Sequence, residues 1–203
     1  MQSILSQLFQ SPFFSAISLA CVLLFLYSTY ATYVIFFKSV KTDRQIKTLG
    51  KTSSIWHLHD INLRVKTVFQ TLQTACQQDK PALLSDIMTQ HLFAHYELTL
   101  QNLDDQNIKE VIKHVKLHSF SVVSVQKNES DIDDVLWVYM YFSKTDFEIN
   151  REDESVVEGH PGLAIHYKQL WKFELENNQW KLALIRENVH LADIEALTSE
   201  FSK

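Results

Sequence analysis

Hydrophobic residues form one unbroken run near the start of the chain and become periodic after it. The stretch from Phe13 to Phe37 contains no charged residue. A helix of this length is about 37 Å long, enough to cross a hydrocarbon core of about 30 Å with some tilt. We therefore expect a short N-terminal tail at residues 1–12 and a transmembrane helix at residues 13–37.

A cleaved signal peptide is the alternative interpretation of this run. Signal peptides begin with basic residues, whereas residues 1–12 contain no Lys or Arg. The apolar run is also longer than the hydrophobic core of a signal peptide. A membrane anchor that is not cleaved is therefore the favoured prediction.

Five basic residues follow the apolar run directly: Lys38, Lys41, Arg44, Lys47 and Lys51. Asp43 is the one acid among them. Because basic flanks stay on the cytoplasmic side, they predict a C-terminal domain in the cytoplasm, or in the matrix of an organelle. We interpret residues 38–55 as a basic linker, in which four residues are candidate contacts with anionic lipid head groups: Lys38, Lys41, Arg44 and Lys47.

From about residue 56 the pattern indicates a globular domain that begins with helices. Apolar residues recur at helical spacing from Val65 to Cys76, and Asp60 is expected to cap this helix. Pro81 is expected to begin a second helix, with a bend, that reaches Leu100. Residues 104–107, Asp-Asp-Gln-Asn, are a turn signal.

The period then changes to two, which indicates strands. We expect strands over residues 111–125, 135–142, 163–175 and 180–186, the last two joined by a turn at Asn177 and Asn178. Residues 148–162 resemble an acidic loop, and residues 191–201 a short terminal helix. Helices followed by antiparallel strands predict an α+β domain at residues 56–203, with helices packed on one face of a sheet.

Composition limits the function classes. The net charge of −5 gives no general electrostatic support for binding nucleic acid. Three glycines and three prolines are too few for a collagen-like or low-complexity chain. Cys21 lies in the apolar run and Cys76 on a predicted helix, so no structural disulfide is expected.

Nine histidines raise the question of a metal site. His91 and His95 are one helical turn apart, but no glutamate follows His91 as in the zincin pattern. His114 and His118 would lie about 13 Å apart along a strand, too far for one ion. We therefore expect ordinary polar histidines, with no metal and no cofactor.

No motif for an enzyme stands out. The chain contains no glycine-rich phosphate loop and no nucleophile elbow. Three aspartates, Asp131, Asp133 and Asp134, are expected in a solvated turn. Four aromatic residues are candidates for a pocket or a packed hairpin: Trp171, Phe173, Trp180 and Tyr96. Cross-strand core packing is the favoured interpretation of the two tryptophans, and a pocket wall is the alternative.

Two groups of residues together resemble a known family. Val68–Cys76 with Leu83–Thr89, and Leu170–Phe173 with Trp180–Ile185, are similar to the opening and the ending of one domain. That domain is the C-terminal domain of the mitochondrial import-motor adaptor, translocase subunit forty-four. The resemblance covers residues 60–188. It implies a fold like nuclear transport factor two, in which helices pack on a strongly curved, cone-like antiparallel sheet with a large pocket. It also implies membrane association and an adaptor or scaffold role.

We therefore predict a non-enzymatic binding or scaffold protein of an inner membrane, acting in protein translocation or membrane-associated assembly. Its expected partners are membrane lipid and another protein, with a second copy of the chain as a further candidate. One alternative is a periplasmic scaffold subunit of a type IV secretion machine, against which the basic residues after Phe37 argue. Another is a small-molecule enzyme on the same fold, for which no catalytic set is recognisable.

Overall fold

The structure is a computed structural model that describes residues 12–127, 134–198 and 200–201. It divides into two units, Met1–Phe37 and Lys38–Lys203, and each is considered by itself. Residues 1–11 of the expected tail lie outside the described residues, as do Asp131 and Asp133.

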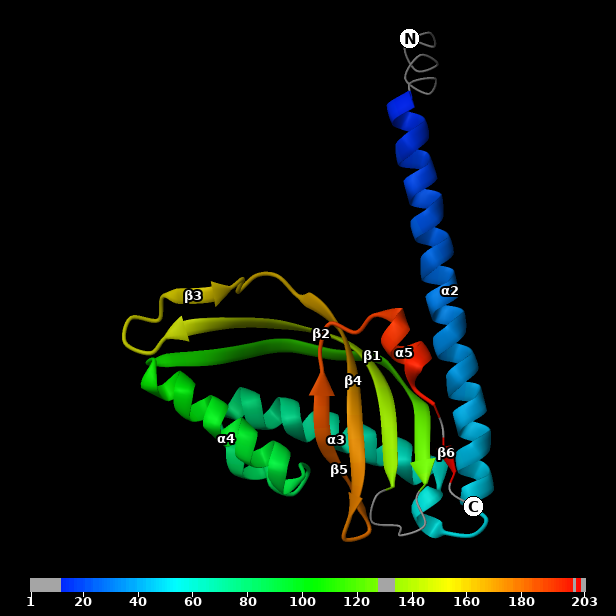
Figure 1. The fold of residues 1–203 in the computed structure, drawn as a ribbon. Coiled ribbons are helices and arrows are strands. Elements are labelled where there is room, and N and C mark those ends of the chain that lie inside the picture. Colours follow the sequence, from blue (N-terminus) through cyan, green and yellow to red (C-terminus); the bar gives the residue numbers. More distant parts are fainter. Residues whose placement is uncertain (1–11, 128–133, 199, 202–203) are drawn as a thin grey trace. The chain divides into compact units, whose positions relative to one another are not determined.

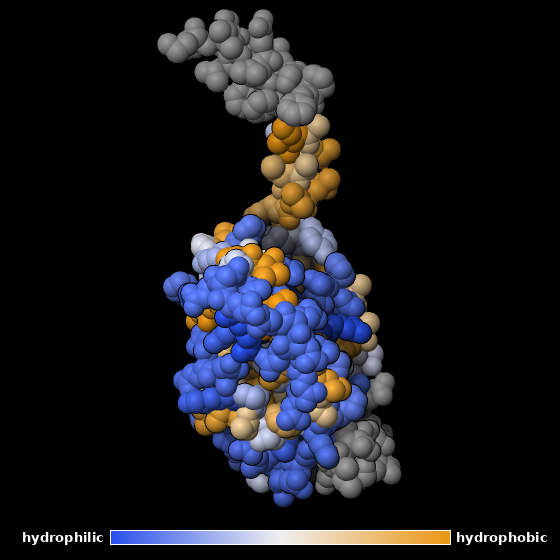
Figure 2. Space-filling view, turned by 90° about the vertical axis from the view of Figure 1, so that its left-hand side faces the viewer, coloured by the Kyte–Doolittle hydropathy of each residue, from blue (hydrophilic) through white to orange (hydrophobic). Residues whose placement is uncertain are grey.

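The described part of the first unit belongs to helix α2 (Pro12–Leu49). Within the described residues, α2 is the one helix that is long and apolar enough to cross a membrane, a property that signal sequences share. Most of its large apolar side chains between Ile17 and Phe37 are exposed, with Leu24 and Phe25 each 67% accessible. Figure 2 shows this stretch as a hydrophobic surface. Such a surface suits a lipid environment and supports membrane anchoring.

The second unit combines the end of α2 with short helices and a sheet. Its further elements are the 3₁₀ helix η1 (Ser54–Trp56), α3 (Leu58–Gln78), the 3₁₀ helix η2 (Pro81–Leu84), α4 (Gln90–Asp105), β1 (Ile108–Lys127), β2 (Val135–Asn150), β3 (Val156–Gly159), β4 (Ile165–Glu176), β5 (Gln179–Arg186), α5 (Leu191–Ala196) and β6 (Glu200–Phe201). The order of helices and strands agrees with the predicted α+β class.

The strands form one sheet in the order β5-β4-β2-β1-β6, and β3 pairs with β2. All pairs are antiparallel except β1 with β6. Three register shifts interrupt the β1–β2 ladder, and such bulges bend a strand and increase its twist. Figure 1 shows α3 and α4 beneath one face of the curved sheet. The predicted arrangement of helices on a curved antiparallel sheet is therefore confirmed.

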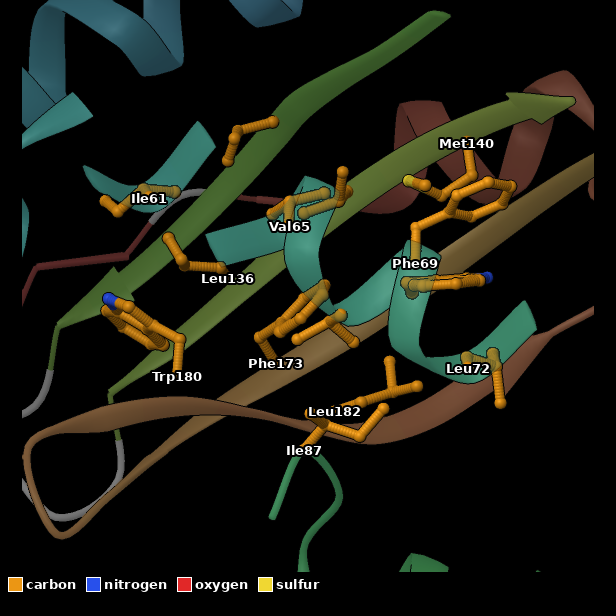
Figure 3. Packing of buried hydrophobic residues seen from close by; sticks show 14 of the residues in the cluster. Ile61, Val65, Phe69, Leu72, Ile87, Leu136, Met140, Phe173, Trp180 and Leu182 are labelled. Atoms are coloured by element: carbon orange, nitrogen blue, oxygen red, sulfur yellow. The ribbon is translucent and has the colours of Figure 1, made fainter. Parts of the chain in front are cut away.

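The core lies between α3 and this inner face of the sheet. Figure 3 shows Ile61, Val65, Phe69 and Leu72 of α3 pointing toward the strands. The ring centroids of Phe69 and Phe142 are 5.3 Å apart, a T-shaped contact that aromatic pairs favour. Burial of this helical stripe explains why the sequence shows apolar residues at helical spacing here.

The hairpin between β4 and β5 forms as expected. Asn177 and Asn178 both have positive φ, 51° and 60°. Asparagine tolerates this left-handed conformation, which the favoured two-residue hairpin turns require.

The expected linker at residues 38–55 has a different structure. Its first part continues α2 to Leu49, and η1 follows at its end. Thr42 and Ile46 are 1% and 0% exposed, because they pack into the second unit. Sequence patterns did not reveal this packing, because Lys41, Arg44 and Lys47 occupy the opposite, solvated face of the same helix and made the segment resemble a linker.

The expected bent helix after Pro81 is instead two elements. η2 ends at Leu84, and Thr89 begins α4 by accepting a hydrogen bond from the Leu92 N–H. Between them the chain pairs with β5, since Leu182 N donates to Ile87 O and Thr89 N donates to Leu182 O. The apolar spacing runs on through this break, which is why the sequence pattern does not reveal it.

Four further expectations were wrong in detail. Much of the expected acidic loop at residues 148–162 is a hairpin of β2 and β3. The terminal helix ends at Ala196, and the short strand β6 follows. His57 is the N-cap of α3, so Asp60 lies in the first helical turn rather than at the cap. Asp134, expected in a solvated turn, is 1% exposed.

Candidate functional site

A hollow of about 230 Å³ opens where the ends of α3 and α4 meet the start of β1. Its lining includes Cys76 of α3, Tyr96 and Gln101 of α4, Glu110 of β1, and Arg151 after β2. The lining mixes apolar side chains with acids, bases and hydroxyl groups. A concave site with a few convergent polar groups is the usual form of a ligand pocket.

Cys76 and Tyr96 form one polar pair in the wall of this hollow. The Cys76 Sγ and Tyr96 Oη atoms are 3.2 Å apart, so one of them donates a hydrogen bond to the other. Burial raises the pKa of the Cys76 thiol and that of the Tyr96 phenol. Both groups are therefore protonated at neutral pH, which makes them hydrogen-bond partners for a ligand rather than nucleophiles.

A second polar group continues from the hollow along the inner face of the sheet. Lys144 Nζ lies 3.6 Å from Glu110 Oε1 and 2.8 Å from Asp146 Oδ2. Tyr167 donates its hydroxyl hydrogen to Asp146 Oδ1 over 2.5 Å. The Lys144 side chain is 14% exposed, so this ammonium group is largely removed from water. We call Cys76, Tyr96, Glu110, Lys144, Asp146 and Tyr167 the inner polar cluster.

The strand pattern explains how this cluster arises. Alternate residues of β2 face the core, and Leu136, Val138, Met140 and Phe142 belong to the apolar cluster. Lys144 and Asp146 occupy the next two positions on the same face. The inner face thus changes from apolar to polar beyond Phe142, toward the hollow. Charges at core-facing positions cost free energy, so this part of the inner face is a candidate site.

Glu110 contributes a carboxyl group to the lining of the hollow. Desolvation raises the pKa of its carboxyl group, although the nearby Lys144 ammonium opposes this effect. A carboxyl group of this kind can accept a hydrogen bond or a proton from a ligand in the hollow.

Arg151 connects three of the segments that surround the hollow. Its guanidinium forms an ion pair with Asp104 at the end of α4 and donates from Nε to Ile108 O over 3.1 Å. Arg151 N also donates to Asn107 O over 2.9 Å. These contacts join α4, β1 and the β2–β3 turn, so Arg151 shapes the site rather than offering a charge to a ligand.

The four predicted binding residues lie in different places. Tyr96 lines the hollow. Trp171 and Phe173 are fully buried in the core, at 0% exposure. Trp180 is 5% exposed and borders a second, more open hollow of about 520 Å³ beside Arg64. The two tryptophans do not pair across the hairpin, since Trp171 lies opposite Ile185 and Trp180 opposite Leu175.

The predicted membrane-surface residues divide into two sets. Lys41, Arg44 and Lys47 are exposed at helical spacing on one face of α2. Lys38 is partly buried, and its Nζ donates to the carbonyl oxygens of Glu195 and Leu197. The first set is available to other molecules, whereas Lys38 is engaged within the second unit.

The histidines form no cluster of three metal-ligating residues within the described part of the chain. His91 and His95 are both exposed on α4. His114 and His118 lie on β1, as expected, and the two differ in their surroundings. His118 contacts Tyr141 and His166, with ring centroids 5.0 and 5.2 Å away.

Sequence reasoning found Tyr96 but missed Glu110, Lys144, Asp146 and Tyr167. The one available signal was the replacement of apolar by charged residues at alternate positions after Phe142. That signal is ambiguous, because the same pattern marks a strand leaving the core for solvent.

No protein-family model and no curated protein matches the sequence. The fold is similar to the intermembrane space region of the chloroplast protein ARC6, with a TM-score of 0.42, 10% identity and coverage of 61% of this chain and 92% of that one. It is also similar to a putative polyketide cyclase of Xanthomonas campestris pv. campestris, with a TM-score of 0.30, 12% identity and coverage of 64% and 93%. Similarities of this size assign neither a family nor a function.

Proposed function

We propose that this chain is a single-pass membrane protein that holds a non-enzymatic binding domain at the cytoplasmic or matrix face of an inner membrane. The observation that carries the proposal is the exposed, uncharged apolar length of α2 in a chain whose second unit is an α+β domain with a polar hollow. A role as an adaptor in protein translocation or membrane-associated assembly follows from the resemblance to the import-motor adaptor domain.

Membrane anchoring is tested by alkaline extraction of membranes that contain the full chain. The double variant Leu24→Arg/Leu26→Arg should appear in the soluble fraction, because each arginine costs about 2.5–3.5 kcal/mol at the centre of a spanning helix. Leu63→Arg is the matched control, since Leu63 is an exposed leucine of α3. Extraction of the unaltered chain by carbonate, or a mature N-terminus after residue 31, would contradict the anchor.

Orientation is tested by fusing alkaline phosphatase or a cytoplasmic reporter after Lys203. We expect activity from the cytoplasmic reporter alone. Replacing Lys41, Arg44 and Lys47 together with Gln should weaken this preference, because the positive flank would be lost. Lys38 is left unchanged, since it has a structural contact. Phosphatase activity in the unaltered chain would favour the periplasmic secretion scaffold.

A small-molecule enzyme is the second candidate, and the inner polar cluster is the observation that favours it. Glu110, with its raised pKa, and the protonated Tyr96 hydroxyl line one hollow, an arrangement that suits proton transfer. The variant Glu110→Gln distinguishes the enzyme from the non-enzymatic binding domain. Loss of turnover of a small molecule with an unchanged melting temperature would support the enzyme. Unchanged partner binding with no turnover in either protein would support the binding domain.

A further inference from the structure

The outer face of the sheet, opposite the inner polar cluster, carries a compact group of basic and hydroxyl-bearing residues. Alternation places Lys116 of β1, Tyr141 and Ser143 of β2, and His166 and Lys168 of β4 on this face. Their backbones are neighbours across the sheet, because Ser143 pairs with both Lys116 and His166, and Tyr141 pairs with Lys168.

His118 joins this group through a bulge. Leu117 pairs with Phe142 and Ser119 with Tyr141, so His118 is the extra residue of β1 at this point. A bulge redirects the side chain that it adds, and such bulges are frequent beside functional sites. Here the His118 ring stands beside the rings of Tyr141 and His166. We call Lys116, His118, Tyr141, Ser143, His166 and Lys168 the outer basic patch.

Hydroxyl groups hold both imidazole rings in place. His118 Nε2 is 2.9 Å from Ser143 Oγ, and His166 Nδ1 is 3.1 Å from Tyr141 Oη. Each ring keeps its second nitrogen without a hydrogen bond in the described part of the chain, and both histidines are exposed. The rings are therefore fixed in orientation, with one nitrogen of each available to a ligand.

The charges of the patch all have one sign. Lys116 and Lys168 are exposed, and neither forms an ion pair within the described residues. No acid occupies the outer-face positions from 113 to 121 on β1, 139 to 147 on β2 or 166 to 170 on β4. This is unusual in a chain with a net charge of −5. Desolvation lowers the pKa of His118, and repulsion by His166 and Lys116 lowers it further.

This charge pattern distinguishes between two ligand classes. Two histidines with hydroxyl partners resemble part of a transition-metal site, but a metal cation would meet the ammonium groups of Lys116 and Lys168. An anion would relieve the repulsion within the patch and could accept hydrogen bonds from both lysines and from protonated imidazoles. Complementarity therefore favours an anion.

We propose that the outer basic patch binds the phosphate group of a small soluble phosphate ester. The patch spans three strands, so it is about 10 Å wide, which suits one compact anionic group rather than an extended membrane surface. The patch lies on the face of the sheet opposite the inner polar cluster, so the proposal does not depend on the proposed function.

The test uses the full chain in nanodiscs of phosphatidylcholine at low ionic strength, with glycerol phosphate as the probe. Binding is measured by calorimetric titration. The double variant Lys116→Gln/Lys168→Gln should bind about fivefold more weakly, since each exposed ion pair contributes about 0.5 kcal/mol. Lys172→Gln is the matched control, because Lys172 lies on the same face of β4 but is paired with Glu174. Equal affinity in the double variant and the unaltered chain would overturn the proposal.

A second measurement follows the pH dependence with inorganic sulfate, whose own charge does not change between pH 5.5 and 8, about the range in which histidine titrates. Affinity should rise as the pH falls, because a protonated imidazole attracts the anion, and His118→Asn/His166→Asn should remove this rise. The charged and titratable neighbours on the three strands are Lys116, Tyr141 and Lys168. A rise that persists in the histidine variant would contradict the role assigned to the rings.

Two further arms decide the ligand class and its source. If zinc binds in a way that depends on His118 and His166, and phosphate does not bind, the patch is a metal site rather than an anion site. Nanodiscs that contain phosphatidic acid test the lipid source. If they protect the two histidines from diethyl pyrocarbonate while glycerol phosphate does not bind, the ligand is a lipid head group rather than a soluble ester. Either result overturns the proposal as stated.

Discussion

Lys38 Nζ donates a hydrogen bond of 2.6 Å to the carbonyl oxygen of Leu197, which lies 159 residues further along the chain. A second bond of 3.0 Å reaches the Glu195 carbonyl, so one ammonium group satisfies two carbonyls at the end of α5. Carbonyls at a helix C-terminus lack intrahelical partners, and a cation is favourable there. This contact joins α2 to the C-terminal segment of the second unit.

Replacing Lys38 by Met should therefore lower the stability of the second unit by about 1 kcal/mol, the usual contribution of such hydrogen bonds at a partly exposed site. Chemical denaturation of the full chain measures this change, and hydrogen exchange should increase near Leu197. Lys41→Met is the control, because Lys41 is exposed one helical turn away. Equal effects of the two variants would show that the contact does not stabilise the protein.

Trp171→Ala should destabilise the second unit by about 3–5 kcal/mol, the cost of removing a large aromatic side chain from a core. Trp171 is fully buried, packs beside Phe69 with ring centroids 5.8 Å apart, and donates from Nε1 to Gln169 Oε1 over 2.8 Å. Thermal unfolding followed by circular dichroism measures the loss. Leu184→Ala is the control, since this leucine of β5 is 42% exposed. An unchanged melting temperature with lost partner binding would make Trp171 a pocket residue instead.

Gly159→Ala should destabilise the β2–β3 hairpin. Gly159 has φ of +85°, and an added Cβ would lie 2.8 Å from both Asp146 O and Phe147 Cα. The left-handed conformation alone costs a non-glycine residue about 1–2 kcal/mol, and here backbone atoms also clash with the new methyl group. Hydrogen exchange at β3 should rise, with less change in the core. Gly162→Ala is the control, because nothing lies within 4 Å of its Cβ position.

The sequence predicted those parts of the fold whose signal is local. Helix α3 was found because one stripe from Val65 to Leu72 is buried, and the β4–β5 turn because Asn177 and Asn178 favour positive φ. The break at Thr89 was missed because its cause is distant: the chain there pairs with Leu182 of β5. The helix at residues 38–49 was missed because its frequent lysines suggested a solvated linker. The evidence for packing is the burial of Thr42 and Ile46, which the sequence pattern does not show.

The candidate site was predicted only through Tyr96. Its charged members and Tyr167 come from three strands, and they meet because the curved sheet brings β1, β2 and β4 side by side. Lys144 and Asp146 look like surface residues until the register places Glu110 and Tyr167 against them. The same holds for the outer basic patch, where a bulge at His118 creates a contact that strict alternation does not predict.

Glu110→Gln should raise the melting temperature at pH 7.5, and this gain should shrink as the pH approaches 4.5. Desolvation raises the folded-state pKa of Glu110 above its ordinary value of 4.5, so the folded protein binds this proton more tightly than the unfolded chain does. Above the folded-state pKa the ionised carboxylate therefore costs stability. Between that pKa and 4.5 the folded protein takes up the proton first, and the cost disappears.

The neutral amide avoids the cost at all pH values, and Lys144 keeps its ion pair with Asp146, whose atoms are 2.8 Å apart. Thermal unfolding of both proteins at several pH values between 4.5 and 7.5 measures the difference. Glu174→Gln is the control, because this carboxylate lies outside the hollow and is paired with Lys172. If Glu110→Gln instead lowers the melting temperature at pH 7.5, attraction to Lys144 outweighs desolvation, and the carboxylate is a structural ion-pair partner rather than a group held ready for a ligand.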